Sequence, residues 1–223
     1  MCFSATASFT AAAVLLPAGA GAVYQAARTD RAYIPICALP LFFGIQQAFE
    51  GGVWIAGDHG NMALVNIFSL GYMFFSWLAW PVWVPFSVYF LEPLRRRPLY
   101  LVLSILGGML GAIQYVPYFL HENWLSIQFL PHVIRYNAIE LLDFVIGRDA
   151  TYVIYIFVII APLLISSNKD ARIFGVLVSG VLAVTYMFFQ YAYISVFCFG
   201  GAIMSLYLVT TILRKAPSVV STL

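Results

Sequence analysis

Seven long apolar runs constrain the fold of this chain more than any other feature of its sequence. Apolar runs of about 18 or more residues are long enough to cross a bilayer as helices, and only the fifth run is shorter. The chain is 63% hydrophobic and 9% charged, whereas soluble domains have about 25% charged residues. The sequence therefore predicts an all-α integral membrane bundle, a single transmembrane domain over residues 1–223, with helices at 6–27, 33–56, 62–91, 99–120, 151–166, 173–191 and 194–213.

The basic residues between these runs predict the orientation of the bundle. In a seven-span arrangement, Arg135 and Arg148 lie on one side of the membrane, and the other nine of the 11 lysines and arginines lie on the opposite side. Loops rich in lysine and arginine stay in the cytoplasm. We therefore expect the N-terminus outside the cell and the C-terminus in the cytoplasm.

The segment 121–150 is the one substantial piece between two runs, and we expect it outside the cytoplasm. From Pro131 onward its polar residues recur at steps of three and four, which is typical of an amphipathic helix. They are His132, Arg135, Tyr136, Glu140 and Asp143. Such a helix could rest in the membrane interface or fold over the bundle as a lid.

Glu50 is the only acidic residue well inside an apolar run. A carboxylate within the membrane is costly and usually serves a function. Gly51 and Gly52 follow it and would let another backbone or a ligand come close. In the seven-span arrangement several polar residues share its depth, in the outer half of the bundle. We therefore expect an outward-facing pocket centred on Glu50, with Gln46, Gln47, Trp54, Gln114, Tyr118, His121 and Gln190 around it.

One hypothesis for this pocket is a metal site. Cys2, Glu50, His121 and His132 all fall on the outer side, and thiolate, carboxylate and imidazole groups bind zinc. The side chain and free amine of an N-terminal cysteine would also suit copper. A catalytic metal needs an open position for water, so the protein could be a metal-dependent membrane hydrolase with Glu50 and His121 as catalytic residues.

Other hypotheses use the same residues without a metal. Glu50 could be the titrating group of a small-solute or proton-coupled transporter. It could form an acid–base pair with a histidine that acts on a lipid, a small amide or an ester. The chain could also be a structural or sensory subunit. Its expected partners are the lipid bilayer and a small molecule, ion or lipid.

Several classes of function and structure are disfavoured. No lysine lies within a run, which excludes a retinal Schiff base. A net charge of +2 without a basic patch does not indicate nucleic-acid binding. Three scattered cysteines predict no disulfide framework. The first run has no basic residue before it, so we expect a retained helix rather than a cleaved leader. Residues 216–223 are expected to form a flexible tail.

Two motifs carry a resemblance to a known family. The chain opens Met1-Cys-Phe-Ser-Ala, and Gly-Ile-Gln-Gln-Ala-Phe-Glu-Gly-Gly-Val-Trp54 follows in the second run. It resembles an uncharacterised family of bacterial seven-helix membrane proteins, for which no function is known. The resemblance implies that the N-terminus and the second helix share a site, and it suggests the bacterial inner membrane. The residues that match the characteristic positions of that family are Cys2, Ser4, Gln46, Gln47, Glu50 and Trp54.

Overall fold

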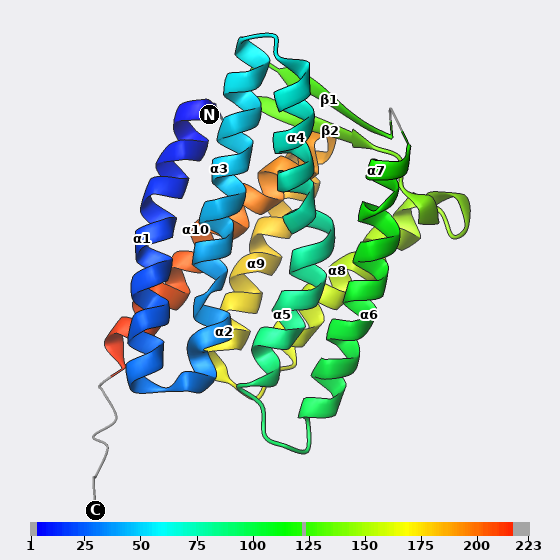
Figure 1. Cartoon of the computed structure of the whole chain (residues 1–223). Coiled ribbons are helices and arrows are strands. Elements are labelled where there is room, and N and C mark those ends of the chain that lie inside the picture. Colours follow the sequence, from blue (N-terminus) through cyan, green and yellow to red (C-terminus); the bar gives the residue numbers. More distant parts are fainter. Residues whose placement is uncertain (1–3, 122–123, 216–223) are drawn as a thin grey trace, which may run out of the picture.

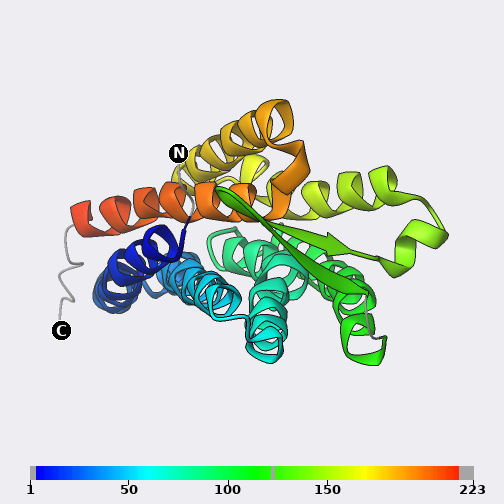
Figure 2. The same ribbon diagram turned by 90° about the horizontal axis from the view of Figure 1, so that it is seen from above.

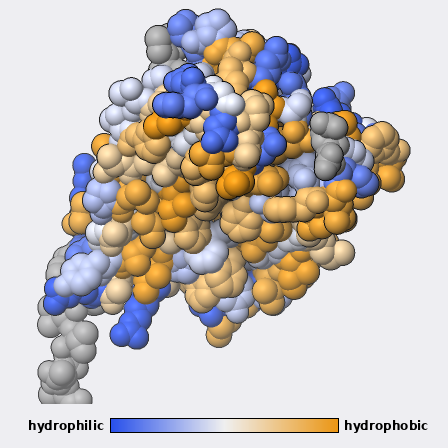
Figure 3. All heavy atoms as spheres, turned by 45° about the horizontal axis from the view of Figure 1, so that its top comes forward, coloured by the Kyte–Doolittle hydropathy of each residue, from blue (hydrophilic) through white to orange (hydrophobic). Residues whose placement is uncertain are grey.

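The computed structural model describes residues 4–121 and 124–215, and most of them are helical. Within these described residues, six helical segments are long and apolar enough to cross a membrane, which agrees with the predicted multi-pass membrane protein. They are Ala5–Thr29, Arg31–Asp58, Met62–Tyr89, Arg97–Leu120, Lys169–Phe188 and Gln190–Arg214. Figure 3 shows broad hydrophobic areas along the sides of the molecule, with hydrophilic residues gathered mainly toward its ends.

Several of these segments consist of consecutive elements. The first is α1 (Ala5–Thr29), and the second joins a 3-10 turn (Arg31–Tyr33) to α2 (Ile34–Cys37) and α3 (Leu39–Asp58). The third joins α4 (Met62–Met73), a π-helical turn (Phe74–Ala79) and α5 (Trp80–Tyr89), and the fourth joins α6 (Arg97–Tyr115) and α7 (Pro117–Leu120). The last two are α9 (Lys169–Phe188) and, after a 3-10 turn at Gln190–Ala192, α10 (Tyr193–Arg214).

The fifth predicted helix is also present, as α8 (Arg148–Leu164), but it has only 17 residues. The helices alternate in direction along the chain (Figure 1). The turn between α3 and α4 lies at the end of the molecule where α1 begins. The junctions between α1 and α2 and between α5 and α6 lie at the opposite end, where α10 ends.

Residues 125–138 form a β-hairpin, so the amphipathic helix predicted there is wrong. Strand β1 (Leu125–Leu130) pairs antiparallel with β2 (Val133–Ala138), and Leu130 faces Val133 across a two-residue turn. In β2 the buried residues Ile134, Tyr136 and Ala138 alternate with more exposed ones. This period of two belongs to a strand with one covered face. Viewed from above, the hairpin crosses the end of the bundle (Figure 2).

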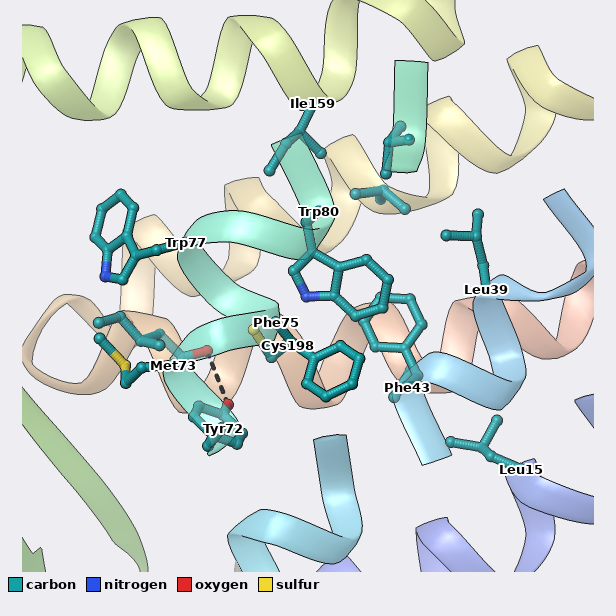
Figure 4. Packing of buried hydrophobic residues seen from close by; sticks show 14 of the residues in the cluster. Leu15, Leu39, Phe43, Tyr72, Met73, Phe75, Trp77, Trp80, Ile159 and Cys198 are labelled. Carbon is teal, nitrogen blue, oxygen red and sulfur yellow. Dashed lines mark hydrogen bonds between the residues drawn. The ribbon is translucent and has the colours of Figure 1, made fainter. Parts of the chain in front are cut away.

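Close contacts between backbones and stacked aromatic rings hold the bundle together. A Cβ atom at Gly107 of α6 would lie 2.0 Å from the carbonyl oxygen of Pro81, and one at Gly111 would lie 2.4 Å from that of Trp77. Small residues allow such close approach between membrane helices. In the core, the rings of Phe43 and Trp80 stack with their centroids 4.1 Å apart (Figure 4).

Candidate functional site: a cavity beneath the hairpin

Glu50 is buried among three helices. Its side chain on α3 is 2% exposed. The Ser195 hydroxyl of α10 donates a hydrogen bond to Oε1 of Glu50, and Gln47 and Ser8 also face the carboxylate. A carboxylate this deep needs such donors because its desolvation is costly. The environment explains how the acid is tolerated, but Glu50 does not line the large cavity described below.

The space beside the two glycines after Glu50 is filled by aromatic rings. A Cβ atom at Gly51 would lie 2.7 Å from the Phe9 ring of α1, and one at Gly52 would lie 2.9 Å from the Phe68 ring of α4. The sequence led us to expect another backbone or a ligand at these positions. Instead, the glycines let α1 and α4 pack against α3.

Gln46 belongs to a second buried network, which reaches the π-helical turn. Its amide nitrogen donates to the Ser76 hydroxyl at 3.0 Å, and its amide oxygen accepts from the Trp80 indole nitrogen at 3.2 Å. The Ser76 hydroxyl lies 3.6 Å from the Cys198 sulfur. Tyr155 of α8 donates to the backbone carbonyl of Ser76. Because π turns interrupt the regular helical hydrogen bonding, such a turn can present the Ser76 hydroxyl to both Gln46 and Cys198.

Ser76 and Cys198 also belong to the wall of a cavity of about 820 Å³. The cavity lies among α8, α9, α10 and strand β2, with the π-helical turn contributing part of the wall. Its size falls in the range of small-molecule sites. The wall is rich in tyrosine and in aliphatic side chains, including Tyr136, Tyr152, Val153, Tyr155, Ile156, Leu182, Tyr186, Tyr191, Tyr193 and Phe197.

The cavity wall also carries polar groups of two kinds. Tyr136 and Thr185 are buried, and their hydroxyls have no hydrogen-bond partner among the residues that the structure describes. The charged lining residues are Arg135, Arg148 and Asp149, and all three are exposed. A mainly apolar wall with a few polar groups is the usual character of a small-molecule site.

Glu140 is a second buried acid, which the sequence analysis did not single out. It follows β2 and is 0% exposed. The Gln114 amide of α6 donates to its Oε2 at 3.3 Å, and the Tyr152 hydroxyl of α8 donates to its Oε1 at 3.0 Å. Tyr152 is in turn hydrogen-bonded to Tyr193 of α10. Glu140 thereby fixes two tyrosines of the cavity wall and ties three helices to the segment after the hairpin.

The charge state of Glu140 depends on its burial. Burial, reinforced by the nearby Asp143 and opposed by Arg148, raises the pKa of Glu140 from the ordinary value of 4.5 to about 8. The Arg148 guanidinium is itself held by Asp143 at 2.9 Å and by the carbonyl oxygen of Ala138 at 3.1 Å. The sequence feature that could have indicated the burial of Glu140 is its position between two apolar residues, Ile139 and Leu141.

The other predicted site residues are dispersed. Gln190 lines the cavity, and Tyr118 is buried near Glu140. Trp54 packs against the Phe129 ring of the hairpin, with centroids 5.9 Å apart. His121 is exposed and stacks on Trp124 at a centroid distance of 4.3 Å. The pocket predicted around Glu50 is thus distributed over several separate environments.

The metal hypothesis gains no support from this arrangement. In residues 4–121 and 124–215, no group of three or more histidine, cysteine, aspartate and glutamate side chains is placed to hold a metal ion. His121 and His132 are exposed, whereas Glu50 is buried. Cys2, the remaining predicted ligand, lies outside the described residues, as does the predicted tail at 216–223.

Comparison with known proteins places the chain in a family without assigning an activity. No curated protein and no solved structure matches it. The model of a family described as "Family of unknown function (DUF6629)" matches residues 1–222. The prediction of an uncharacterised family is therefore confirmed, and the chain belongs to this family of unknown function.

Proposed function

We propose that this protein binds a small amphipathic molecule in the cavity among α8, α9, α10 and strand β2. The cavity volume of about 820 Å³ is the observation that carries the proposal, because it matches the volume of known small-molecule sites. Its lining combines aliphatic and aromatic side chains with charged groups. A ligand with an apolar body and a polar end would match both parts.

We also propose that the cavity faces away from the cytoplasm in a seven-span arrangement. Both cationic lining residues, Arg135 and Arg148, belong to the end of the molecule that carries the hairpin, and the other nine basic residues fall in the opposite connections and near the C-terminus. The positive-inside rule then places the hairpin outside. Labelling of introduced cysteines from each side of the membrane tests this arrangement.

Binding fits the geometry better than transport does. The next hollow beyond Cys198 and Phe197 holds only about 30 Å³, and every other residue around it is apolar, including Phe43, Trp80 and Phe174. A polar solute or ion would lack hydrogen-bonding groups along this path, and unsatisfied polar groups are costly in an apolar interior. The cavity therefore suits retention of a ligand better than passage toward the opposite end.

Filling the cavity tests the proposal. In native mass spectrometry of detergent-purified protein, we expect wild type to retain added hexadecanoic acid or hexadecanol. Leu182→Trp places a large ring in the cavity wall and should weaken retention by about tenfold or more, since a loss of 1.4 kcal/mol in binding is tenfold. The matched control is Val184→Trp on the same helix, because Val184 is 51% exposed and does not line the cavity.

Two results would count against this function. The first is a wild-type protein that retains neither amphiphile above the level of nonspecific adducts. The second is equal retention by wild type, Leu182→Trp and Val184→Trp, which would place the bound molecules on the outer surface of the bundle. Folding of each variant is checked by its thermal unfolding midpoint in the same detergent.

A further inference from the structure

The charges around the cavity indicate the chemical class of its ligand. Of its three charged lining residues, two are arginines and one is an aspartate, Asp149. Arg148 already contacts Asp143 and the carbonyl oxygen of Ala138 through two of its nitrogen atoms. Arg135 is exposed and makes no ion pair or hydrogen bond through its side chain among the described residues. Its guanidinium is therefore the cation available to a ligand.

The position of Arg135 in the hairpin suits contact with a ligand head group. In β2 both Arg135 and Tyr136 line the cavity. Tyr136 is buried and Arg135 is exposed, so Arg135 belongs to the solvent-accessible part of the lining. Its partner across the hairpin is Gln128, an uncharged residue. A guanidinium can bind a carboxylate or a phosphate through two parallel hydrogen bonds.

The wall away from these charges suits a hydrocarbon chain. Val153 and Ile156 of α8, Leu182 of α9 and Phe197 of α10 all line the cavity. Burial of apolar ligand surface against such side chains is favourable, by about 25 cal/mol per Å². Tyr186, which lines the cavity, is 69% exposed, so part of the cavity wall reaches the outer surface of the molecule.

We infer that the cavity takes an acyl-chain amphiphile with an anionic head group, with Arg135 binding the head and the aliphatic wall binding the chain. This inference rests on the proposed function, because it names the ligand class of the same cavity. A free fatty acid and an anionic phospholipid each combine an acyl chain with an anionic head group. The carboxylate of the first and the phosphate of the second are each within the repertoire of a guanidinium.

Hexadecanoic acid and hexadecanol separate this inference from the proposed function, because they share a sixteen-carbon chain but carry different head groups, an ionisable carboxyl and a neutral hydroxyl. In competition experiments followed by native mass spectrometry at about neutral pH, we expect wild type to prefer the acid. Arg135→Gln should lower the affinity for the acid by about tenfold, as expected for loss of a charged hydrogen bond, and should lower the affinity for hexadecanol by much less. Arg135→Lys should keep most of the preference.

A matched control and a second probe complete the experiment. Arg28→Gln removes a cation at the opposite end, where Arg28 lies beside Tyr24, and should leave hexadecanoic acid binding unchanged. Dipalmitoyl phosphatidylglycerol replaces the carboxylate with a phosphate. Tighter binding of either anionic probe than of hexadecanol supports the inference. The tighter of the two anionic probes shows whether the ligand is a free fatty acid or an anionic phospholipid.

The inference is overturned if wild type binds hexadecanol as tightly as both anionic probes, or if Arg135→Gln weakens acid and alcohol equally. If Arg28→Gln loses as much affinity for hexadecanoic acid as Arg135→Gln does, the effect is one of overall charge, and the inference is also overturned. In each of these cases the proposed function would still stand, since an amphiphile is bound. If neither the acid nor the alcohol binds, the proposed function itself fails.

Discussion

Glu140 illustrates how a single side chain can organise the wall of the cavity. Its two carboxylate oxygens accept hydrogen bonds from Gln114 and Tyr152, which belong to different helices. Buried polar networks of this kind are stabilising when every group is paired and costly when one is left unpaired. The protonation state of Glu140 should therefore affect the stability of this end of the molecule.

Glu140→Gln should reduce the pH dependence of stability. Because the folded-state pKa of Glu140 is about 8, above its ordinary 4.5, the folded protein favours the protonated acid. Wild type should lose stability as pH rises from about 5 to about 8. Glutamine cannot ionise, so the variant should lack this part of the slope, a difference on the order of 4 kcal/mol. Thermal unfolding midpoints across this pH range measure it.

Glu92→Gln is the matched control at the opposite end of the molecule. Burial raises the pKa of Glu92, but hydrogen bonds from Ser166 and Ser167 outweigh this effect, and the pKa is lowered overall. Its ionised form is therefore favoured in the folded state, and Glu92→Gln should lower the midpoint at neutral pH. A Glu140→Gln variant with the same pH slope as wild type would contradict the role assigned to Glu140.

The sequence indicates that Glu50 is buried but does not indicate that Glu140 is buried, and the difference has a physical reason. An acid inside a long apolar run stands out because the bilayer penalises it, and the burial of Glu50 agrees with that reasoning. Glu140 lies in a mixed segment where acids are common. Its burial depends on Gln114, Tyr152 and Tyr193, which belong to three different helices. No local sequence pattern indicates that these three residues lie close together.

At the scale of elements, a six-span and a seven-span arrangement differ in whether α8 crosses the membrane. Its 17 residues span about 26 Å at 1.5 Å per residue, slightly less than the hydrocarbon core of about 30 Å. A short helix can still cross when the bilayer thins locally or flanking residues reach the interface. If α8 crosses, the hairpin and the start of α9 lie on opposite sides of the membrane.

Cysteine labelling tests whether α8 crosses the membrane. In a background without the native cysteines, a membrane-impermeant maleimide should label Asp149→Cys in intact cells and Lys169→Cys only after permeabilisation. Both positions are exposed. His59→Cys, in the turn before α4, and Arg95→Cys, before α6, are the outer and inner controls. Labelling of Asp149→Cys and Lys169→Cys from the same side would contradict the seven-span arrangement.

The hairpin and the long helices differ in how well the sequence predicts them. Long apolar runs leave few alternatives to a helix in a membrane, because every backbone group must find a hydrogen bond within the segment. Residues 125–138 are short and mixed, and their polar residues match both a helical and an alternating pattern. The alternation of Leu125, Ile127 and Phe129 with other residues is a pattern that favours a strand.

At the scale of the whole molecule, the two ends differ in character. The end with the hairpin holds the large cavity and the hydrogen-bonded networks of Glu50 and Glu140. The opposite end holds the buried Glu92, which accepts hydrogen bonds from Ser166 and Ser167. The sequence predicted that polar residues gather at one depth. It could not predict that α8, α9 and α10 enclose the cavity, because which helices pack side by side depends on contacts between distant segments.

The most direct test of ligand binding is photo-crosslinking with a diazirine-labelled fatty acid in membranes, followed by mapping of the modified residues by mass spectrometry. We expect crosslinks to concentrate on cavity-lining residues that are partly buried, such as Ile156, Leu182 and Phe197, and to decrease in Leu182→Trp. Labelling at the exposed residues Val102, Ile105 and Met109 of α6, which are 51%, 56% and 58% exposed, should be weaker and unchanged in that variant. Crosslinks spread evenly over both sets, with no effect of Leu182→Trp, would contradict binding in the cavity.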